Sequence, residues 1–248
     1  MKLSYSRIGT LLRCPMAYEL KYVKRVEYLA FPYLYLGGSL HLALGKAFEE
    51  KLQGNELRPD EVAGLFADFW DGEAYLEDEE TVAEVDWRRE DPGELREAGI
   101  LLAQRYWRDI SPRVTPVDVE VPFEREVAGV VLTGRIDLVT VEGKLVDWKT
   151  TRRATSDREL ARHLQPSLYL LGMGAEGGEF EFHELVKTNN PYCRIARTRR
   201  SAEELSWLQN VLLPRVVRQI ESGLFPPNPT SFLCSPDTCE VWSYCRRR

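Results

Sequence analysis

One stretch of the sequence reads as a β-hairpin and restricts what the rest of the chain can fold into. Its arms, residues 131–140 and 145–150, are rich in β-branched and apolar residues, and Gly143 lies in the short turn between them. Side chains alternate between the two faces of a strand, so Asp147 and Lys149 point the same way. The sequence therefore predicts a sheet that carries a carboxylate and an ammonium group side by side.

Asp137 on the first arm lies among apolar residues, where an ionised carboxylate is costly unless a cation meets it. A divalent metal held between Asp137 and Asp147 would be such a cation, since Mg²⁺ prefers carboxylates, water and phosphate oxygens. Lys149 would then lie beside a metal-bound water that can attack a phosphodiester. The same residues also fit a structural Asp–Lys pair with one solvated aspartate, and the hairpin alone leaves both interpretations open.

A wider set of polar residues follows the chain in a fixed order: His41, Asp137, Asp147, Lys149, Gln165 and Tyr169. An aspartate, then Asp-Trp-Lys ten residues on, then Gln-x-x-x-Tyr, resembles the core of the PD-(D/E)XK nuclease superfamily, in particular its RecB-like branch. The upstream histidine matches one that this branch commonly carries. The resemblance implies a restriction-endonuclease-like core and a nuclease active site; taken by itself, the lone histidine fits a core position equally well.

In that family the two aspartates and the histidine bind Mg²⁺ or Mn²⁺, the lysine orients the attacking water, and the glutamine and tyrosine contact DNA. A glutamate often lies on the preceding strand, and Glu120 in the predicted strand 114–127 is the matching accessory residue, although a solvated position suits it as well. The implied reaction is hydrolysis of DNA phosphodiester bonds. The resemblance favours an exonuclease that acts on single strands or free ends.

Five cysteines form a second pattern, and their odd number argues against a disulfide framework. Cys14, Cys234, Cys239 and Cys245 supply the four thiolates that a [4Fe–4S] cluster or a tetrahedral zinc ion requires, with Cys193 left over. The pattern lacks the close Cys-x2-Cys pair of zinc sites, which favours iron and sulfur. It is similar to that of iron–sulfur RecB-like nucleases, which include AddB nuclease domains and CRISPR-associated exonucleases, although those usually have Cys-x2-Cys near the C-terminus. Free thiols in a disordered tail are the alternative.

Hydrophobic periodicity predicts helices at residues 4–14, 16–23, 39–52, 59–76, 92–107, 157–171 and 201–220. Further strands are expected at residues 114–127, 180–187 and 193–198. Residues 31–38 read as an aromatic turn, which puts His41 in the first turn of the next helix, and residues 77–91 read as an acidic surface excursion. We expect one α/β domain over residues 1–248, with a mixed central sheet flanked by helices, a helical insertion at 55–110 and a tail, residues 224–248, that packs on the N-terminal helix.

Composition limits the partners. The net charge of −6 argues against a protein that coats nucleic acid by bulk electrostatics. Basic residues cluster at 149–153, 194–200 and 246–248, and each cluster fits either a local phosphate track or a solvated face. No apolar run approaches the ~20 residues of a membrane span, and the N-terminus lacks a signal pattern, so we expect a cytoplasmic protein.

Two other functions fit the same sequence. A non-catalytic nucleic-acid-binding module would keep the nuclease fold as a scaffold, but a scaffold does not require two acids and a lysine at one point. An accessory subunit would use the helical insertion to dock on a helicase or a CRISPR integrase. Cleavage polarity and the choice between DNA and RNA are not encoded in any pattern that we recognise.

Overall fold

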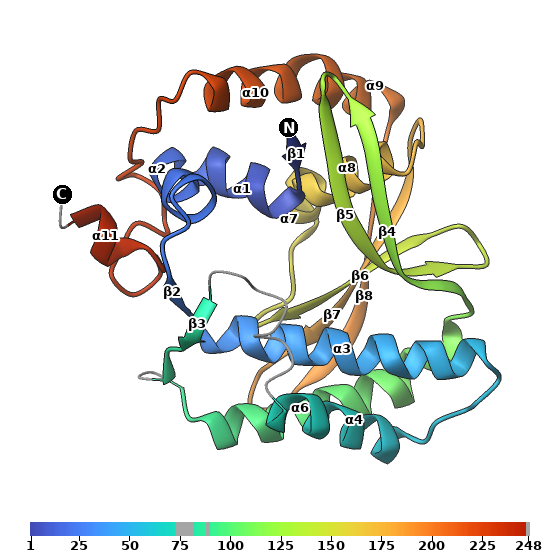
Figure 1. The fold of residues 1–248 in the computed structure, drawn as a ribbon. Helices are drawn as coiled ribbons and strands as arrows, with labels where there is room; N and C mark the ends of the chain where they lie inside the picture. The colour runs from blue at the N-terminus through green and yellow to red at the C-terminus, as the bar shows by residue number, and fades with distance from the viewer. Residues whose placement is uncertain (73–81, 88–89, 247–248) are drawn as a thin grey trace.

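A six-stranded mixed sheet lies at the centre of the protein, with helices on both faces (Figure 1). The computed structural model describes residues 1–72, 82–87 and 90–246. The strands are β1 (Lys2–Leu3), β4 (Pro116–Val127), β5 (Val130–Thr140), β6 (Leu145–Thr151), β7 (Gly178–Val186) and β8 (Tyr192–Arg200). The arrangement confirms the expected mixed α/β fold.

Strand β5 is the point where the sheet divides. It pairs antiparallel with β4 along most of its length, whereas its other edge pairs with β6 at Leu138 and Val139 and with β1 at Val131 and Leu132. Strand β7 continues the sheet parallel to β6, and β8 pairs antiparallel with β7. In Figure 1 β4 and β5 therefore rise away from β6, β7 and β8. The divergence of β5 from β6 leaves room for a site between them.

Two apolar clusters pack on opposite sides of the sheet. The first is built on α1 (Tyr5–Arg13), α8 (Leu164–Gly172), α9 (Ala202–Trp207) and α10 (Leu213–Glu221). The second is built on α3 (Pro32–Leu52), α4 (Pro59–Asp71) and α6 (Pro92–Asp109). Trp148 of β6 is fully buried in the second cluster, where its ring stacks on Phe48 of α3 with 5.8 Å between centroids. This packing fixes α3 against the strand that carries Asp147 and Lys149.

Helix α3 begins seven residues earlier than predicted, so the aromatic turn at residues 31–38 and the first-turn position of His41 were wrong. Pro32 lies in the first turn, where its fixed φ favours the helix and its missing N–H leaves no bond unmade. Gly37 lies beside β6, where a Cβ would be at an ordinary contact distance of 3.8 Å from Thr150 Oγ1. His41 therefore lies well inside a long helix.

The predicted helix 157–171 is two helices, α7 (Asp157–Arg162) and α8, separated by an extended His163 (ψ 123°). Pro166 explains the break, because its ring would clash with the carbonyl of Arg162 in a continuous helix. The predicted capping box at Ser201 and Glu204 is confirmed, and α9, a π-helical turn η4 (Leu208–Leu212) and α10 together form the expected long helix.

The remaining elements are short: α2 (Pro15–Tyr18), the π-helical η1 (Glu19–Val23), β2 (Tyr28–Ala30), β3 (Val82–Val85), η3 (Ser111–Arg113) and α11 (Trp242–Arg246). Strand β3 pairs with β2, which corrects the prediction that residues 77–91 are only a surface excursion. Residues 77–81 and 88–89 of that acidic stretch lie outside the described residues. The same is true of residues 247–248 of the basic run.

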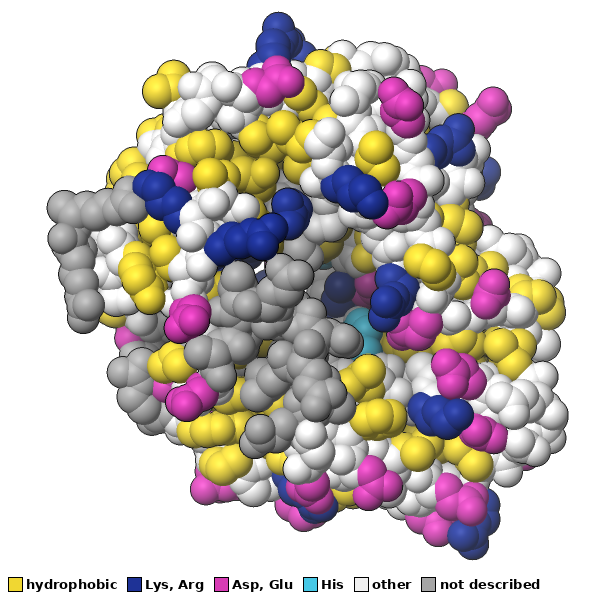
Figure 2. Space-filling model, in the orientation of Figure 1, with side chains coloured by type: hydrophobic (Ala, Val, Ile, Leu, Met, Phe, Trp, Pro, Cys, Tyr) yellow, Lys and Arg dark blue, Asp and Glu magenta, His cyan; other side chains and the backbone are white. Residues whose placement is uncertain are grey.

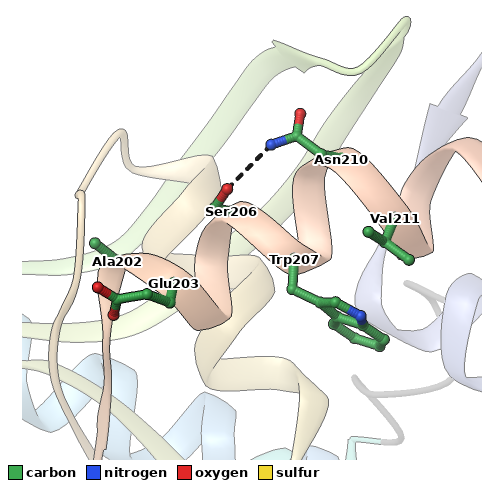
Figure 3. Close-up of a pocket in the computed structure, with 6 residues that line it drawn as sticks. All are labelled: Ala202, Glu203, Ser206, Trp207, Asn210 and Val211. Carbon is green, nitrogen blue, oxygen red and sulfur yellow. Dashed lines mark hydrogen bonds between the residues drawn. The ribbon is translucent and has the colours of Figure 1, made fainter.

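The surface has a hollow at the centre of the face shown in Figure 2, with a histidine and several Lys or Arg side chains at its edge. A shallow depression lies elsewhere, on the outer side of α9 and η4, where Trp207 is 54% exposed (Figure 3). Among the described residues, no helix is both long and apolar enough to cross a membrane.

Candidate active site

The hairpin has the predicted arms and turn, with Gly143 at φ 74°. Pairing between β5 and β6 stops after Leu138, which would leave the backbone N–H of Trp148 without a strand partner. Asp137 Oδ2 accepts that N–H at 2.6 Å. The buried Asp137 carboxylate therefore replaces a ladder hydrogen bond and is held rigidly at the point where the strands separate.

Asp147 and Lys149 lie on one face of β6, as the alternation of side chains predicted. Asp147 is 2% exposed, and its Oδ2 lies 2.8 Å from Lys149 Nζ. Burial alone would lower the pKa of Lys149, but the charge of Asp147 outweighs it and raises this pKa. Lys149 is therefore a stable cation whose side chain is 33% exposed at the site opening.

His41 comes from α3 and meets the first carboxylate. Its Nδ1 lies 3.3 Å from Asp137 Oδ2, and its ring packs edge-on against Trp148 at 5.7 Å. Burial by itself lowers the pKa of His41, but Asp137 outweighs it and raises this pKa to about 9. The Asp137 carboxylate therefore favours the cationic form of His41.

Helix α8 contributes Gln165 and Tyr169 from the other side. Gln165 is buried, and its Nε2 donates to Asp147 Oδ1, which fixes the plane of that carboxylate. The pKa of Tyr169 is raised by burial and then by the charges of Asp147 and Asp137. Both side chains thus lie at the acid pair, and Gln165 acts on Asp147 directly.

Glu120 also faces the site, from β4. Its backbone has φ 53°, a left-handed conformation that is unusual outside glycine, and its side chain lies against Gly45 of α3, where a Cβ would come within 3.3 Å of Oε1. Arg135 Nη1 lies 3.6 Å from Oε2. Burial and the nearby Asp137 raise the pKa of Glu120 to about 7, as often happens at functional sites.

Two residues that the sequence did not single out also lie at the site. The Tyr5 hydroxyl is 3.5 Å from His163 Nε2. Burial raises the pKa of Tyr5 and the charge of Lys149 lowers it, so Tyr5 lies close to that ammonium group. A tyrosine in the first turn of a capped helix has no pattern that distinguishes it from a core residue, and only the packing of α1 beside β6 brings it here.

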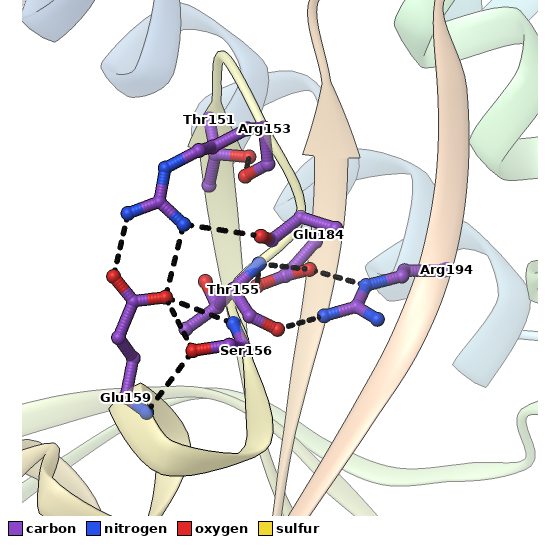
Figure 4. A network of polar contacts seen from close by, with 8 residues as sticks. Thr151, Arg153, Thr155, Ser156, Glu159, Glu184 and Arg194 are labelled. Carbon is purple, nitrogen blue, oxygen red and sulfur yellow. Dashed lines mark hydrogen bonds and ion pairs between the residues drawn. The ribbon is translucent and has the colours of Figure 1, made fainter.

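A polar network fixes the chain where it leaves β6 (Figure 4). Glu184 of β7 accepts from the Thr155 N–H at 3.1 Å and from Arg194 Nε at 2.6 Å, and Arg194 also donates to the Thr155 carbonyl oxygen. Glu159 caps α7 through Ser156 and pairs with Arg153. This network holds the segment that connects Lys149 of β6 to α7 and then to α8, which carries Gln165.

Part of the basic cluster 194–200 is engaged within the fold, while Arg197 and Arg199 are exposed. Arg194 is used by Glu184, Arg197 Nε donates to Glu181 at 2.9 Å, and buried Arg200 donates to the carbonyl oxygens of Leu160 and His163. Arg194 and Arg200 therefore have structural roles.

The tail brings its cysteines to the N-terminal segment. The Asn228 N–H lies 3.4 Å from Cys14 Sγ, and Asn228 Nδ2 donates to the Arg13 carbonyl oxygen at 2.9 Å. Burial raises the pKa of the Cys239 thiol, and the charges of Cys14, Cys234 and Cys245 raise it further. All four predicted cysteines therefore lie in one electrostatic neighbourhood, whereas Cys193 lies apart and donates to the Leu102 carbonyl oxygen.

Within residues 1–72, 82–87 and 90–246, no three His, Cys, Asp or Glu side chains are grouped tightly enough to hold a metal ion as they stand. In the hairpin the acids are engaged by His41 and Lys149 instead. The donor set nevertheless fits a hard cation, because Asp147 Oδ2 is buried and accepts no hydrogen bond of good geometry. Cys14, Cys234, Cys239 and Cys245 are four free thiols near one another, but among the described residues they do not form a ready metal-binding group.

Comparisons with known proteins identify a family for this chain. No curated protein matches the chain. A solved structure from Eubacterium rectale, assigned as an exonuclease, aligns at 17% identity over 80% of this chain and 79% of that chain, with a TM-score of 0.48. The structure of SSO0001 aligns at 16% identity over 98% of this chain and 85% of that chain, with a TM-score of 0.40. The sequence itself matches the PD-(D/E)XK nuclease superfamily over residues 2–246, and the chain belongs to that superfamily.

Proposed function

We propose that this protein is a metal-dependent DNA nuclease, acting as an exonuclease, with His41, Asp137, Asp147 and Lys149 as its catalytic site. One observation carries the proposal: two carboxylates, 6% and 2% exposed, meet at the point where β5 and β6 separate. Buried charge is costly even when it is paired, so apolar residues would stabilise the same fold at least as well. A catalytic role would account for the presence of Asp137 and Asp147 in the interior.

His41, Asp137 and Asp147 would hold Mg²⁺ or Mn²⁺, which when bound lowers the pKa of water and neutralises phosphate charge. The protein's own groups prepare this site. The Trp148 N–H and the Gln165 amide orient the two carboxylates, so little reorganisation is needed when the substrate arrives.

Lys149 would act on the substrate directly. Its ammonium group is exposed enough to donate to a phosphate oxygen or to the attacking water, while Asp147 keeps it charged. Glu120, with a pKa near 7, would be an additional oxygen ligand or a proton acceptor beside Asp137. Tyr169 would line the strand-binding side of the site.

We also propose a [4Fe–4S] cluster bound by Cys14, Cys234, Cys239 and Cys245, with zinc as the less favoured occupant. It would fasten the tail to the N-terminal helices, away from the acid pair. Cys14, Cys234 and Cys245 each raise the pKa of Cys239, so the four thiols lie near one another, which supports this assignment. The role is structural, because these thiols flank α1 and α2 rather than the hairpin.

The deciding experiment is a nuclease assay on end-labelled single-stranded and double-stranded DNA with Mg²⁺, with Mn²⁺ and with a chelator. We expect cleavage with either metal, no cleavage with the chelator, and mononucleotides or short oligonucleotides released progressively from one end. Asp147→Asn is the matched control, because it keeps the Gln165 contact but removes the charge, and its cleavage rate should fall by about 10²- to 10⁴-fold. Cleavage by this variant at the wild-type rate would exclude the hairpin as the active site.

A further inference from the structure

Tyr33, near the start of α3, is 48% exposed although it is large and aromatic. Its ring stacks on Phe31 with 5.6 Å between centroids and 15° between planes. Phe31 therefore supports the ring in a fixed orientation and leaves much of its surface available. A rigid, partly exposed aromatic ring is the kind of platform on which unpaired nucleic-acid bases stack.

The same helix connects this platform to the candidate active site. Tyr33 and His41 are eight residues apart, which is roughly 12 Å along a helix. Between them Gly37 has no side chain and lies against Thr150. Helix α3 and the end of β6 thus run past each other, with His41 at Asp137, Gly37 at Thr150 and Tyr33 beyond. The helix surface between the two ends carries no bulky group at Gly37 and Gly38.

Three cationic side chains lie near Tyr33. Burial raises the pKa of Tyr33 and so does Glu240, whereas Arg13, Lys21 and Arg152 lower it, so all four lie near the ring. Lys21 and Glu240 neutralise each other at 2.5 Å. Arg152 is 70% exposed and pairs with Glu90. Phe31, on which the ring stacks, also lines a pocket with Glu27, Asp86 and Glu240, so both cations and acids surround this platform.

Arg13 links this region to the catalytic lysine. Its described hydrogen bonds go to Gly9 and Thr10 of its own helix, and among the described residues no carboxylate pairs with it. The pKa of Tyr5 is raised by burial and lowered by Lys149 and by Arg13, so Arg13 lies in the fields of both Tyr5 and Tyr33. An exposed guanidinium near both tyrosines is suited to a phosphate group.

We propose that the surface formed by Tyr33, Gly37, Arg13 and Arg152 binds the single-stranded segment of the substrate next to the scissile phosphate. A base stacks on Tyr33, and Arg13 and Arg152 bind backbone phosphates. This inference rests on the proposed nuclease function and specifies its substrate as an unpaired strand. At about 3.4 Å per stacked nucleotide, the 12 Å between His41 and Tyr33 corresponds to roughly three to four nucleotides.

The test measures binding in the presence of a chelator, so that it does not depend on cleavage. The probes are a fluorescent single strand of about ten nucleotides, a blunt duplex of the same sequence and a dinucleotide. For Tyr33→Ala we expect the Kd of the single strand to rise roughly 5- to 150-fold, the range for loss of one stacked base. Tyr33→Phe keeps the ring and should restore binding to within about twofold.

Trp207→Ala is the matched control, because Trp207 is an equally exposed aromatic residue on the outer side of α9 (Figure 3). It should leave every Kd unchanged. Arg13→Gln should weaken single-strand binding and reduce the slope of log K against log salt by about 0.7, the value for one phosphate contact on a single strand. Thermal unfolding of each variant identifies any loss of folded protein.

Three results would overturn the inference: an unchanged Kd for Tyr33→Ala, an equal loss for Trp207→Ala, or a Kd for the blunt duplex as low as that of the single strand. A loss that is equally large for the dinucleotide would also overturn it, because that probe is too short to reach Tyr33 from the site. If wild-type protein binds the strand through Tyr33 but cleaves no DNA with Mg²⁺ or Mn²⁺, the nuclease proposal fails and the binding surface stands.

Discussion

The catalytic hairpin and the cysteine-bearing tail are ordered by different kinds of interaction. The hairpin is held on both faces by large apolar clusters, and Trp148 at its centre is fully buried. The tail has only a small cluster, in which Leu20, Tyr28 and Val241 are the buried members. Packing can therefore hold the acid pair in place without any ligand. The tail depends on a few hydrogen bonds, one partly buried ion pair, and its three thiols near Cys14.

This contrast predicts whether the loss of each ligand affects catalysis or stability. A metal at the hairpin would join a site that the fold has already built, so its loss affects chemistry more than stability. A metal cluster at the tail would stabilise a region that has few buried apolar residues. Its loss should therefore lower the stability of the tail before it lowers the cleavage rate. The following changes test that division in order of expected effect.

Removal of Cys239 should have the largest effect on stability. Protein prepared without oxygen is expected to contain roughly four irons per chain and to be brown, and Cys239→Ala should lose both properties. Joining residue 14 to residue 234 closes a loop of about 220 residues, so the free energy of unfolding should fall by at most about 5 kcal/mol. Limited proteolysis should then cut the tail first, while cleavage of DNA by intact protein continues.

Cys193→Ala is the control for this change, because burial raises the pKa of its thiol to about 12 and it lies away from the other four. It should keep the iron. Stoichiometric zinc without iron would replace the cluster by a zinc site, and the absence of both metals would leave the thiols free.

Loss of Glu181 should affect acid stability and leave catalysis unchanged. Burial alone would raise the pKa of Glu181, but His183, Arg197 and Lys144 outweigh it and hold this pKa at about 2. The folded value lies below the unfolded value of about 4.3, so the stabilisation is present above pH ~4.3 and is lost as the pH falls toward about 2. In Glu181→Gln the free energy of unfolding at neutral pH should fall by up to about 3 kcal/mol, and it should depend less on pH over that window.

Chemical denaturation at a series of pH values measures this effect, with DNA cleavage at neutral pH as the second readout. Glu159→Gln provides the comparison, because Glu159 is an exposed cap whose pKa is also lowered by Arg153, and screening by solvent should make its effect much smaller. A large drop in the cleavage rate of Glu181→Gln would show that the sheet interior and the active site are not independent.

Replacement of His41 should have the smallest effect and should be confined to metal binding. A lost ligand should weaken Mn²⁺ affinity by about 10- to 100-fold, so His41→Ala should regain most activity at high Mn²⁺. Titration of the cleavage rate with Mn²⁺ measures this shift. Lys46→Ala on the same helix controls for disturbance of α3, since its side chain is 42% exposed. An unchanged titration would return His41 to a structural role.

The division between these regions also explains which features the sequence revealed. Alternation and turn chemistry are local, so the hairpin, the shared face of Asp147 and Lys149, and the capped helix at Ser201 were predicted from the residues around them. The prediction of an α/β domain with a mixed sheet followed from the order of these elements along the chain. The start of α3 was missed because the turn signal of Gly37 and Gly38 was given more weight than Pro32, whose fixed φ favours the first turn of a helix.

The sequence by itself determined the strands, the acid–acid–lysine order and the number of thiols, because these depend on residue type and short spacing. Only the tertiary structure decided that β5 parts from β6 at Asp137, that Gln165 fixes Asp147, and that Tyr5 lies beside His163. Those contacts join residues more than a hundred positions apart in some cases, and no local pattern encodes them. They arise because two apolar clusters bury Trp148 and its neighbours, and this packing brings α1, α3 and α8 to the same end of the sheet.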